Sequence, residues 1–131
     1  MEKDGMEKEK IYNWGNKLLF EGEYLNGKIN GKGKEYNYDG KLIFEGEYLN
    51  GQRNGKGKEY NDEGKLIFEG EYLNDKRNGK GKEYFNSVLI FEGEYLKGKR
   101  NGIGKVYDYE GKLIYEGEYL NDKKCLTEWM F

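Results

Sequence analysis

A glycine-rich phrase of about two dozen residues repeats along nearly the whole 131-residue chain, and it limits what the chain can fold into. One copy, from Phe44, places five glycines within 19 residues. Each glycine costs about 1 kcal/mol in a helix interior, so the repeat is not helical. Recurrence at a fixed period indicates stacked units that contact only their neighbours. Copies begin 24, 24, 23 and 24 residues apart, at Phe20, Phe44, Phe68, Phe91 and Tyr115.

Alternation within the copy predicts one β-hairpin per unit. From 42 to 49 the side chains alternate as in a strand, and a second alternating run covers 55–60. The segment "NGQRNG" between them suits a hairpin turn with positive φ, and "NDEGK" forms the next turn. The expected fold is therefore all-β: an elongated, single-layer antiparallel meander of stacked hairpins. It has about eleven strands, the first near 10–13, and a length of roughly 50 Å.

This reading divides the chain into a short tail and one repeat array. Residues 1–9 form the expected N-terminal tail, and the array covers 10–131. Its parts are a partial unit at 10–19, full units at 20–43, 44–67, 68–90 and 91–114, and a terminal capping unit at 115–131. In the capping unit Leu126 and Glu128 replace the usual glycines, and Trp129 and Phe131 follow them, so we expect bulky residues to close this end.

The glycines are expected to have a structural role, because glycine weakens a strand unless something approaches it closely. An aromatic ring of a neighbouring strand is the natural candidate. The sheet would then bury ring area against itself and curl toward the ring side. The structural glycines predicted in this way are Gly22, Gly31, Gly33, Gly46, Gly55, Gly57, Gly70, Gly79, Gly81, Gly93, Gly102, Gly104 and Gly117.

The opposite face carries Glu45 and Glu47 next to Lys56 and Lys58, and the pattern recurs in the other units. Two carboxylates at i and i+2 share a face and could act as a catalytic pair. Repetition beside lysines instead favours a solvated ladder of opposite charges.

Composition argues against several function classes. Aromatic residues reach 16%, which indicates a folded chain although charged residues make up 37%. The 25 acidic and 23 basic residues are interleaved, so no basic face for nucleic acid is expected. The chain contains no histidine and one cysteine, Cys125, which argues against a Cys–His dyad and histidine metal sites. We therefore expect no enzymatic activity, no cofactor, no metal and a cytoplasmic location.

The phrase "FEGEYLNGKINGKGKEY" resembles the MORN (membrane occupation and recognition nexus) repeat, an aromatic-x-Gly-x-aromatic pattern followed by Gly and Gly-x-Gly. Its positions are occupied by Phe44, Gly46, Tyr48, Gly51, Gly55 and Gly57. Tyrosine stands where the family often has tryptophan, and Asn-Gly replaces the usual His-Gly. The resemblance implies a curved β-rod that acts as an interaction scaffold, often self-associating, beside membranes or cytoskeleton.

The leading functional hypothesis is a non-catalytic scaffold that binds a protein through its aromatic and glycine face. Unburied ring edges would contact a peptide or helix, because tyrosine supplies large, stiff contact area with a polar tip. Self-association through the two sheet ends is a further expectation. The residues of this candidate face are Phe20, Tyr24, Phe44, Tyr48, Phe68, Tyr72, Phe91, Tyr95, Tyr115 and Tyr119.

The alternative is binding of anionic phospholipids or phosphoinositides along the edge of the hairpin tips. Each basic residue near a negative membrane contributes about 1 kcal/mol. Acidic residues in the same turns dilute this charge, and a solvated edge that prevents aggregation explains the pattern equally. The candidate lipid-binding edge consists of Lys28, Arg53, Lys76, Arg77, Lys99, Arg100, Lys123 and Lys124.

Overall fold

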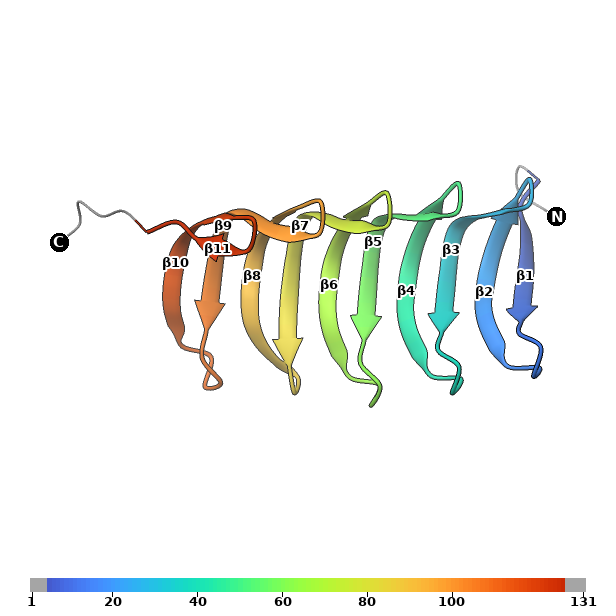
Figure 1. The fold of residues 1–131 in the computed structure, drawn as a ribbon, viewed down its shortest axis with the longest axis horizontal. Helices are drawn as coiled ribbons and strands as arrows, with labels where there is room; N and C mark the ends of the chain where they lie inside the picture. The colour runs from blue at the N-terminus through green and yellow to red at the C-terminus, as the bar shows by residue number, and fades with distance from the viewer. Residues whose placement is uncertain (1–4, 127–131) are drawn as a thin grey trace.

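The computed structural model describes residues 5–126, which form one open sheet of eleven antiparallel strands. Consecutive strands are hydrogen-bonded in sequence order, and no helix occurs within 5–126 (Figure 1). The expected single-layer meander is confirmed. The strands are β1 Glu7–Tyr12, β2 Leu18–Leu25, β3 Lys28–Tyr36, β4 Leu42–Leu49, β5 Gln52–Tyr60, β6 Leu66–Leu73, β7 Lys76–Phe85, β8 Val88–Leu96, β9 Lys99–Tyr107, β10 Leu113–Leu120 and β11 Lys123–Lys124.

Two kinds of turn alternate along the two edges of the sheet. The upper turns join each even strand to the next odd strand, and the lower turns join each odd strand to the next even one (Figure 1). Upper turns have two central residues with positive φ, such as Asn50 (50°) and Gly51 (85°). This is the backbone that Asn-Gly favours in hairpins. The turn geometry expected from "NGQRNG" is therefore present.

The two ends of the array differ from the expected boundaries. Strand β1 begins at Glu7, three residues before the predicted start of the array, so residues 7–9 belong to the sheet. These residues pair with β2, as in Glu9 opposite Gly22. At the other end, β11 contains two residues. Leu126, which was expected to help close this end, is 75% exposed. The other residues of the expected closure, Glu128, Trp129 and Phe131, fall outside the described range.

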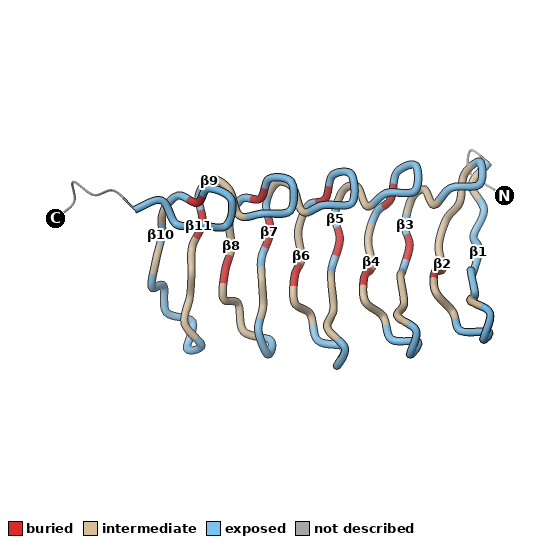
Figure 2. Tube along the Cα trace, viewed as in Figure 1, coloured by how far each residue is buried: buried red, intermediate tan, exposed pale blue. Residues whose placement is uncertain are grey.

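The sheet has two chemically different faces. The ring face carries Phe44 and Tyr48 and their equivalents in the other units, and these rings form the buried core. Buried positions recur on successive strands from β2 to β10 (Figure 2). The groove face carries Glu45, Glu47 and their neighbours Lys56 and Lys58, with their equivalents. Because there is one layer, the core consists of ring contacts within each even strand and between one even strand and the next.

Candidate functional site

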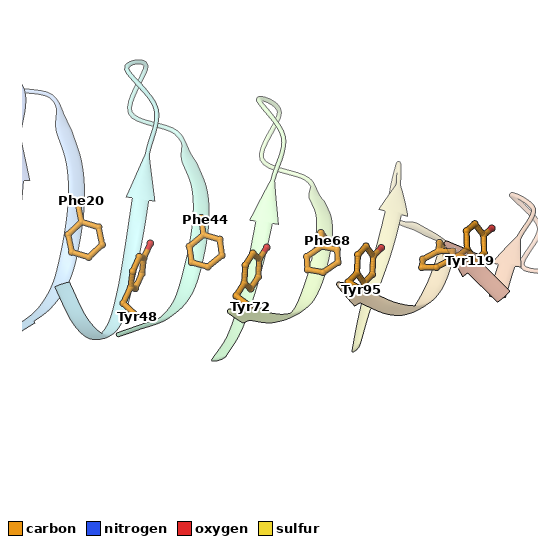
Figure 3. Packing of buried hydrophobic residues seen from close by; sticks show 8 residues of the cluster. Phe20, Phe44, Tyr48, Phe68, Tyr72, Tyr95 and Tyr119 are labelled. Carbon is orange, nitrogen blue, oxygen red and sulfur yellow. The ribbon is translucent and has the colours of Figure 1, made fainter. Parts of the chain in front are cut away.

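Aromatic rings on the ring face form a continuous column. Each Phe ring meets the Tyr ring of its own strand and the Tyr ring of the next unit edge-on, as Phe44 does with Tyr48 (5.7 Å between centroids) and Tyr72 (5.1 Å). Figure 3 shows this alternation of Phe and Tyr along the rod. Edge-to-face pairs contribute about 0.5–1.5 kcal/mol each beyond the area they bury. The column therefore adds to the cohesion that the backbone hydrogen bonds of the sheet provide between units.

This packing leaves little ring surface for a partner. Phe44 and Phe68 are fully buried, and Tyr48 is 5% exposed. Eight of the ten residues expected to bind a partner are buried, and Tyr24 and Tyr115 are partly buried. The expectation of unburied ring edges is therefore wrong for these eight. Their positions are Phe20, Phe44, Tyr48, Phe68, Tyr72, Phe91, Tyr95 and Tyr119.

A hydrogen-bonded cluster, here called the clamp, covers the column at three junctions between units. In the first clamp, Arg53 donates Nε to Glu35 at 2.9 Å and Nη2 at 3.0 Å, and the Tyr48 hydroxyl donates to the same carboxylate. The Arg53 guanidinium lies 4.0 Å from the Phe44 ring centroid. The other two clamps are Arg77–Glu59–Tyr72 and Arg100–Glu83–Tyr95.

The clamps remove three arginines from the candidate lipid-binding edge. Side chains of Arg53, Arg77 and Arg100 are 22–25% exposed, and each guanidinium is committed to a carboxylate. Lys124 occupies the equivalent position in the last unit and lies 4.5 Å from the Tyr115 ring. Assigning these side chains to a membrane-facing row was wrong, because they point back over the core.

Ionisation in the clamps follows from burial and from these hydrogen bonds. Burial opposes the charge on Glu59, but the bonds from Arg77 and Tyr72 outweigh it and lower the pKa of this carboxyl. The pKa of Glu83 is lowered for the same reasons, through Arg100 and Tyr95. Burial and the bond to Glu59 raise the pKa of Tyr72. The clamp therefore holds a charged carboxylate between a cation and a neutral hydroxyl.

The glycines have three different structural roles. A Cβ on Gly57 would lie 2.5 Å from Phe44 Cζ and 3.0 Å from Tyr72 Cε1, so this position accommodates two rings, as expected. A Cβ on Gly46 would instead lie 2.6 Å from the Cα of Gly57, the glycine opposite it. Gly55 has a positive φ (105°), and a Cβ there would meet the carboxylate of Glu47 and not a ring. The expected ring contact is therefore wrong for Gly31, Gly55, Gly79 and Gly102.

Clamp positions change together at the ends of the array. At the first junction, Ile11 and Ile29 occupy the positions of the clamp glutamate and arginine. At the last junction, Val106 and Lys124 occupy them. As a result, the buried Tyr119 hydroxyl is the one buried side-chain polar atom within 5–126 that has no hydrogen-bond partner. The three complete clamps therefore belong to the interior of the rod.

On the groove face, each glutamate of the "EGE" pair has a fixed partner. Tyr60 donates its hydroxyl to Glu45 at 2.9 Å, and the backbone N–H of Lys56 donates to Glu47 at 2.7 Å. Burial and the bond to Glu45 raise the pKa of Tyr60 to about 12. The carboxylates thus accept hydrogen bonds that join β4 to β5. This differs from the expected ladder, since the register places Glu45 opposite Lys58 but no glutamate–lysine ion pair forms within 5–126.

A groove of about 1650 Å³ follows the middle of the groove face from β1 to β9. Its floor is glycine backbone, such as Gly46 and Gly57, and its walls are the glutamates and lysines of successive strands. The hollow of the sheet therefore lies opposite the rings, and the expected curl toward the ring side was wrong. Lysines such as Lys56, Lys58 and Lys80 have exposed side chains. The arrangement can bind a long partner.

A second row of exposed side chains follows the upper edge of the same face. Leu49 is 50% exposed, Leu73 46% and Leu96 48%. Each ends an even strand and lies opposite the first residue of the next strand, which is lysine in four of the five units. We call this the Leu–Lys row. It consists of Leu25, Lys28, Leu49, Gln52, Leu73, Lys76, Leu96, Lys99, Leu120 and Lys123.

Within residues 5–126 no group of three or more Cys, Asp or Glu side chains has an arrangement that would hold a metal ion. No helix in the same range has the length and apolar character needed to cross a membrane.

Comparison with known protein families matches the repeat unit by unit. The MORN repeat model matches five times, at residues 20–41, 44–65, 68–87, 91–112 and 115–125. No curated protein matches the chain. MORN repeats are generally associated with membrane or protein interaction. Because the matches cover more than half of the chain and each falls on one hairpin of the meander, this protein belongs to the MORN-repeat family.

Proposed function

We propose that the protein is a non-catalytic scaffold that binds a segment of another protein in the groove. The observation that carries this proposal is the continuous groove over successive units, with free lysine side chains above bare backbone. The proposed site lies on the groove face and not on the ring face that the sequence suggested, because the rings are buried by the chain itself.

Charge in the groove favours a partner segment that carries carboxylates. Nine lysines and nine glutamates line it, but Glu9 occupies a ring-face position, so nine lysines face eight groove-face glutamates. The glutamates already accept hydrogen bonds, as in Glu47, whereas Lys56 and Lys58 have no carboxylate within ion-pair distance in the described chain. An acidic segment would satisfy these ammonium groups. In unit four, Ile103 stands where the preceding units have a lysine. It is 51% exposed and offers an apolar contact.

Photo-crosslinking tests the groove directly. A photoreactive amino acid at Lys58 reports on the groove, and one at Lys97, an exposed lysine in an upper turn, is the control. We expect a crosslinked protein from position 58 that disappears when Lys56, Lys80 and Lys82 are changed to serine. Adducts that form equally from position 97, or that survive these serines, would reject the groove as the site.

Anionic lipid binding through the Leu–Lys row is a second candidate. Half-exposed leucines beside lysines would insert apolar groups while lysines meet headgroups, at about 1 kcal/mol for each cation. The clamp arginines play no part in it. Sedimentation with phosphatidylserine vesicles should show salt-sensitive binding that falls at least tenfold when Leu49, Leu73 and Leu96 become serine. Binding that these serines leave unchanged would exclude the row.

The exposed free thiol of Cys125 is consistent with a cytoplasmic setting.

A further inference from the structure

The last junction between units, where β9 and β10 meet β11, holds an incomplete clamp. In each of the three complete clamps a glutamate accepts hydrogen bonds from an arginine and from a tyrosine hydroxyl. At the last junction Tyr119 keeps the place of the tyrosine, and Lys124, opposite it, keeps a cation in the place of the arginine. Val106 stands in the place of the glutamate. The junction therefore has both donors and lacks the carboxylate that they would bind.

The Tyr119 hydroxyl is oriented toward the place of the missing carboxylate. Its ring meets the Phe91 ring edge-on, with centroids 5.4 Å apart, as the equivalent Tyr95 ring meets Phe68 at 5.2 Å. Figure 3 shows the hydroxyls of the labelled tyrosines on the same side of the column. The others donate to clamp glutamates, whereas Tyr119, which is 4% exposed, has no hydrogen-bond partner within 5–126. A buried hydroxyl without a partner destabilises the fold.

Lys124 supplies the positive charge of the incomplete clamp. Its Nζ lies 4.5 Å from the centroid of the Tyr115 ring, much as the clamp arginines lie 3.9 or 4.0 Å from phenylalanine rings. Its side chain is exposed, and no Asp or Glu of residues 5–126 lies within ion-pair distance of it. Each complete clamp is neutral, because one cation meets one carboxylate. Among the described residues, the last junction instead carries a positive charge without a counterion.

The first junction shows that a junction without a clamp needs neither charge. There Ile11 and Ile29 replace the glutamate and the arginine together, so no cation is left over. The last junction loses the anion alone. Valine has no atoms that correspond to the carboxylate carbon and the two oxygens of glutamate. The last unit thus keeps the groups that bind a carboxylate, although the described part of the chain provides none.

We propose that the last junction is a binding site for a carboxylate of another molecule, either the C-terminus or an acidic side chain of a partner protein. The Tyr119 hydroxyl donates a hydrogen bond to this carboxylate, and the Lys124 ammonium group pairs with its charge. The flexible lysine stem lets the ammonium group leave the Tyr115 ring as the carboxylate enters. No described strand pairs beyond β11, so the site is reached from the end of the rod. It lies on the ring face, and the inference is independent of the groove.

Sodium acetate is the probe for this site, because acetate carries the group that Val106 lacks. The measurement is an NMR titration of the full chain at pH 7, with sodium chloride at the same ionic strength as the control. We expect saturable shifts of the amide signals of Val106, Tyr119 and Lys124, while those of Ile11 and Ile29 at the first junction stay in place. Shifts that do not saturate, or that chloride reproduces, would indicate an adventitious ion only and overturn the proposal.

Two substitutions remove the site in opposite ways. Val106→Glu supplies the carboxylate within the chain, and Tyr119→Phe removes the hydroxyl, so each should weaken acetate binding at least tenfold. Tyr24→Phe, the same change at the first junction, is the matched control and should leave binding unchanged. Urea unfolding gives a second readout, because acetate should raise the midpoint of the parent and not that of Val106→Glu. Acetate binding that survives Val106→Glu would overturn the site.

Two further comparisons identify the source of the carboxylate. N-acetylglycine imitates a protein C-terminus and propionate imitates a glutamate side chain, so the tighter of the two shows which group the site prefers. Glu128→Gln tests the chain's own acidic residue, which lies outside the described range. Acetate binding by this variant but not by the parent would mean that Glu128 already fills the site, and would overturn the proposal of an external carboxylate.

Discussion

At a few positions in each unit no side chain larger than glycine's fits, and Gly57 is an example. Its missing side chain is the space into which Phe44 and Tyr72 pack from two neighbouring strands. Phe44 is fully buried, so its ring has nowhere to move. The backbone of Gly57 does not have a positive φ, so only crowding restricts this position.

Alanine at Gly57 should therefore destabilise the protein by crowding alone. Overpacked cores lose about 1–3 kcal/mol, and a contact of 2.5 Å against a fixed ring belongs at the upper end. Gly15→Ala is the matched control, because its Cβ would meet the nearest atom at 3.5 Å in an exposed turn. Urea unfolding of the two variants measures the difference. Equal midpoints would contradict the ring-over-glycine packing.

The clamp carboxylates predict acid sensitivity. Glu59 and Glu83 have folded-state pKa values below the ordinary 4.5, because their hydrogen bonds outweigh burial. Above pH 4.5 both are ionised in the folded and unfolded chains, and their contribution to stability is fully present. As pH falls, the unfolded chain takes up protons first, so stability is lost until the folded-state pKa is passed.

Thermal unfolding of Glu59→Gln against the parent tests this pH dependence. The variant should be less stable at pH 7, and the gap should narrow below pH 4.5 as the parent carboxyl becomes neutral. A gap that stays constant from pH 7 to pH 3 would show that the charge on Glu59 contributes nothing.

At the level of elements, each clamp joins two neighbouring hairpins. Arg77 lies on β7 and Glu59 on β5, so the bond spans the strand between them. The first junction has Ile11 and Ile29 at the equivalent positions, and the sheet continues through it. The chain thus contains a natural replacement of a half-buried ion pair by two apolar residues. Such replacements are often neutral, whereas loss of one partner is costly.

A double-mutant cycle at Glu59 and Arg77 should show strong coupling. Glu59→Ile alone leaves a half-buried guanidinium without its carboxylate, and Arg77→Ile alone leaves the carboxylate without its cation. The double variant should be more stable than the sum of the single changes predicts, with a coupling of about 1–3 kcal/mol by denaturant unfolding. If the effects of the two single changes on the free energy of unfolding simply add, the ion pair between Glu59 and Arg77 contributes no coupling energy.

Much of this architecture could be predicted from the sequence, because period and alternation determine strands, turns and faces directly. The ring-over-glycine contact at Gly57 followed from the same alternation. The clamps could not be predicted, since they join residues 17 or 18 positions apart on different strands. One signal was available: Glu35 and Arg53 have equivalents that change together at the array ends, to Ile11 with Ile29 and Val106 with Lys124. Without the clamps, the buried rings and arginines were mistaken for binding residues.

At the scale of the whole molecule, each unit contacts only its neighbours, and β1 differs from the interior strands at one position that the rings require. On β1, Glu9 stands where the interior has Gly33, a position that must be bare for rings to pack. A further repeat could not place its phenylalanine over Glu9. Burial raises the pKa of Tyr24, and the negative charge of Glu9 raises it further. Extension of the rod at β1 is therefore disfavoured.

Removal of one whole unit should leave a shorter rod with intact junctions. Deletion of residues 44–67 brings Arg77 to the position of Arg53, opposite Glu35. We expect a far-ultraviolet spectrum of the same shape and a lower unfolding midpoint, because stability is roughly a sum over units and junctions. Deletion of 44–55, half a unit, is the control and should abolish cooperative unfolding. A folded half-unit variant would contradict the repeat register.

The order of the strands has a mechanical consequence. A pull between the two ends of the rod acts along the direction in which the strands stack, so it loads the ladder bonds one pair at a time. Hairpins should then peel away singly from an end, each releasing a contour length on the order of 80 Å. Under tension the protein would lengthen in equal steps, and each step would be the release of one hairpin.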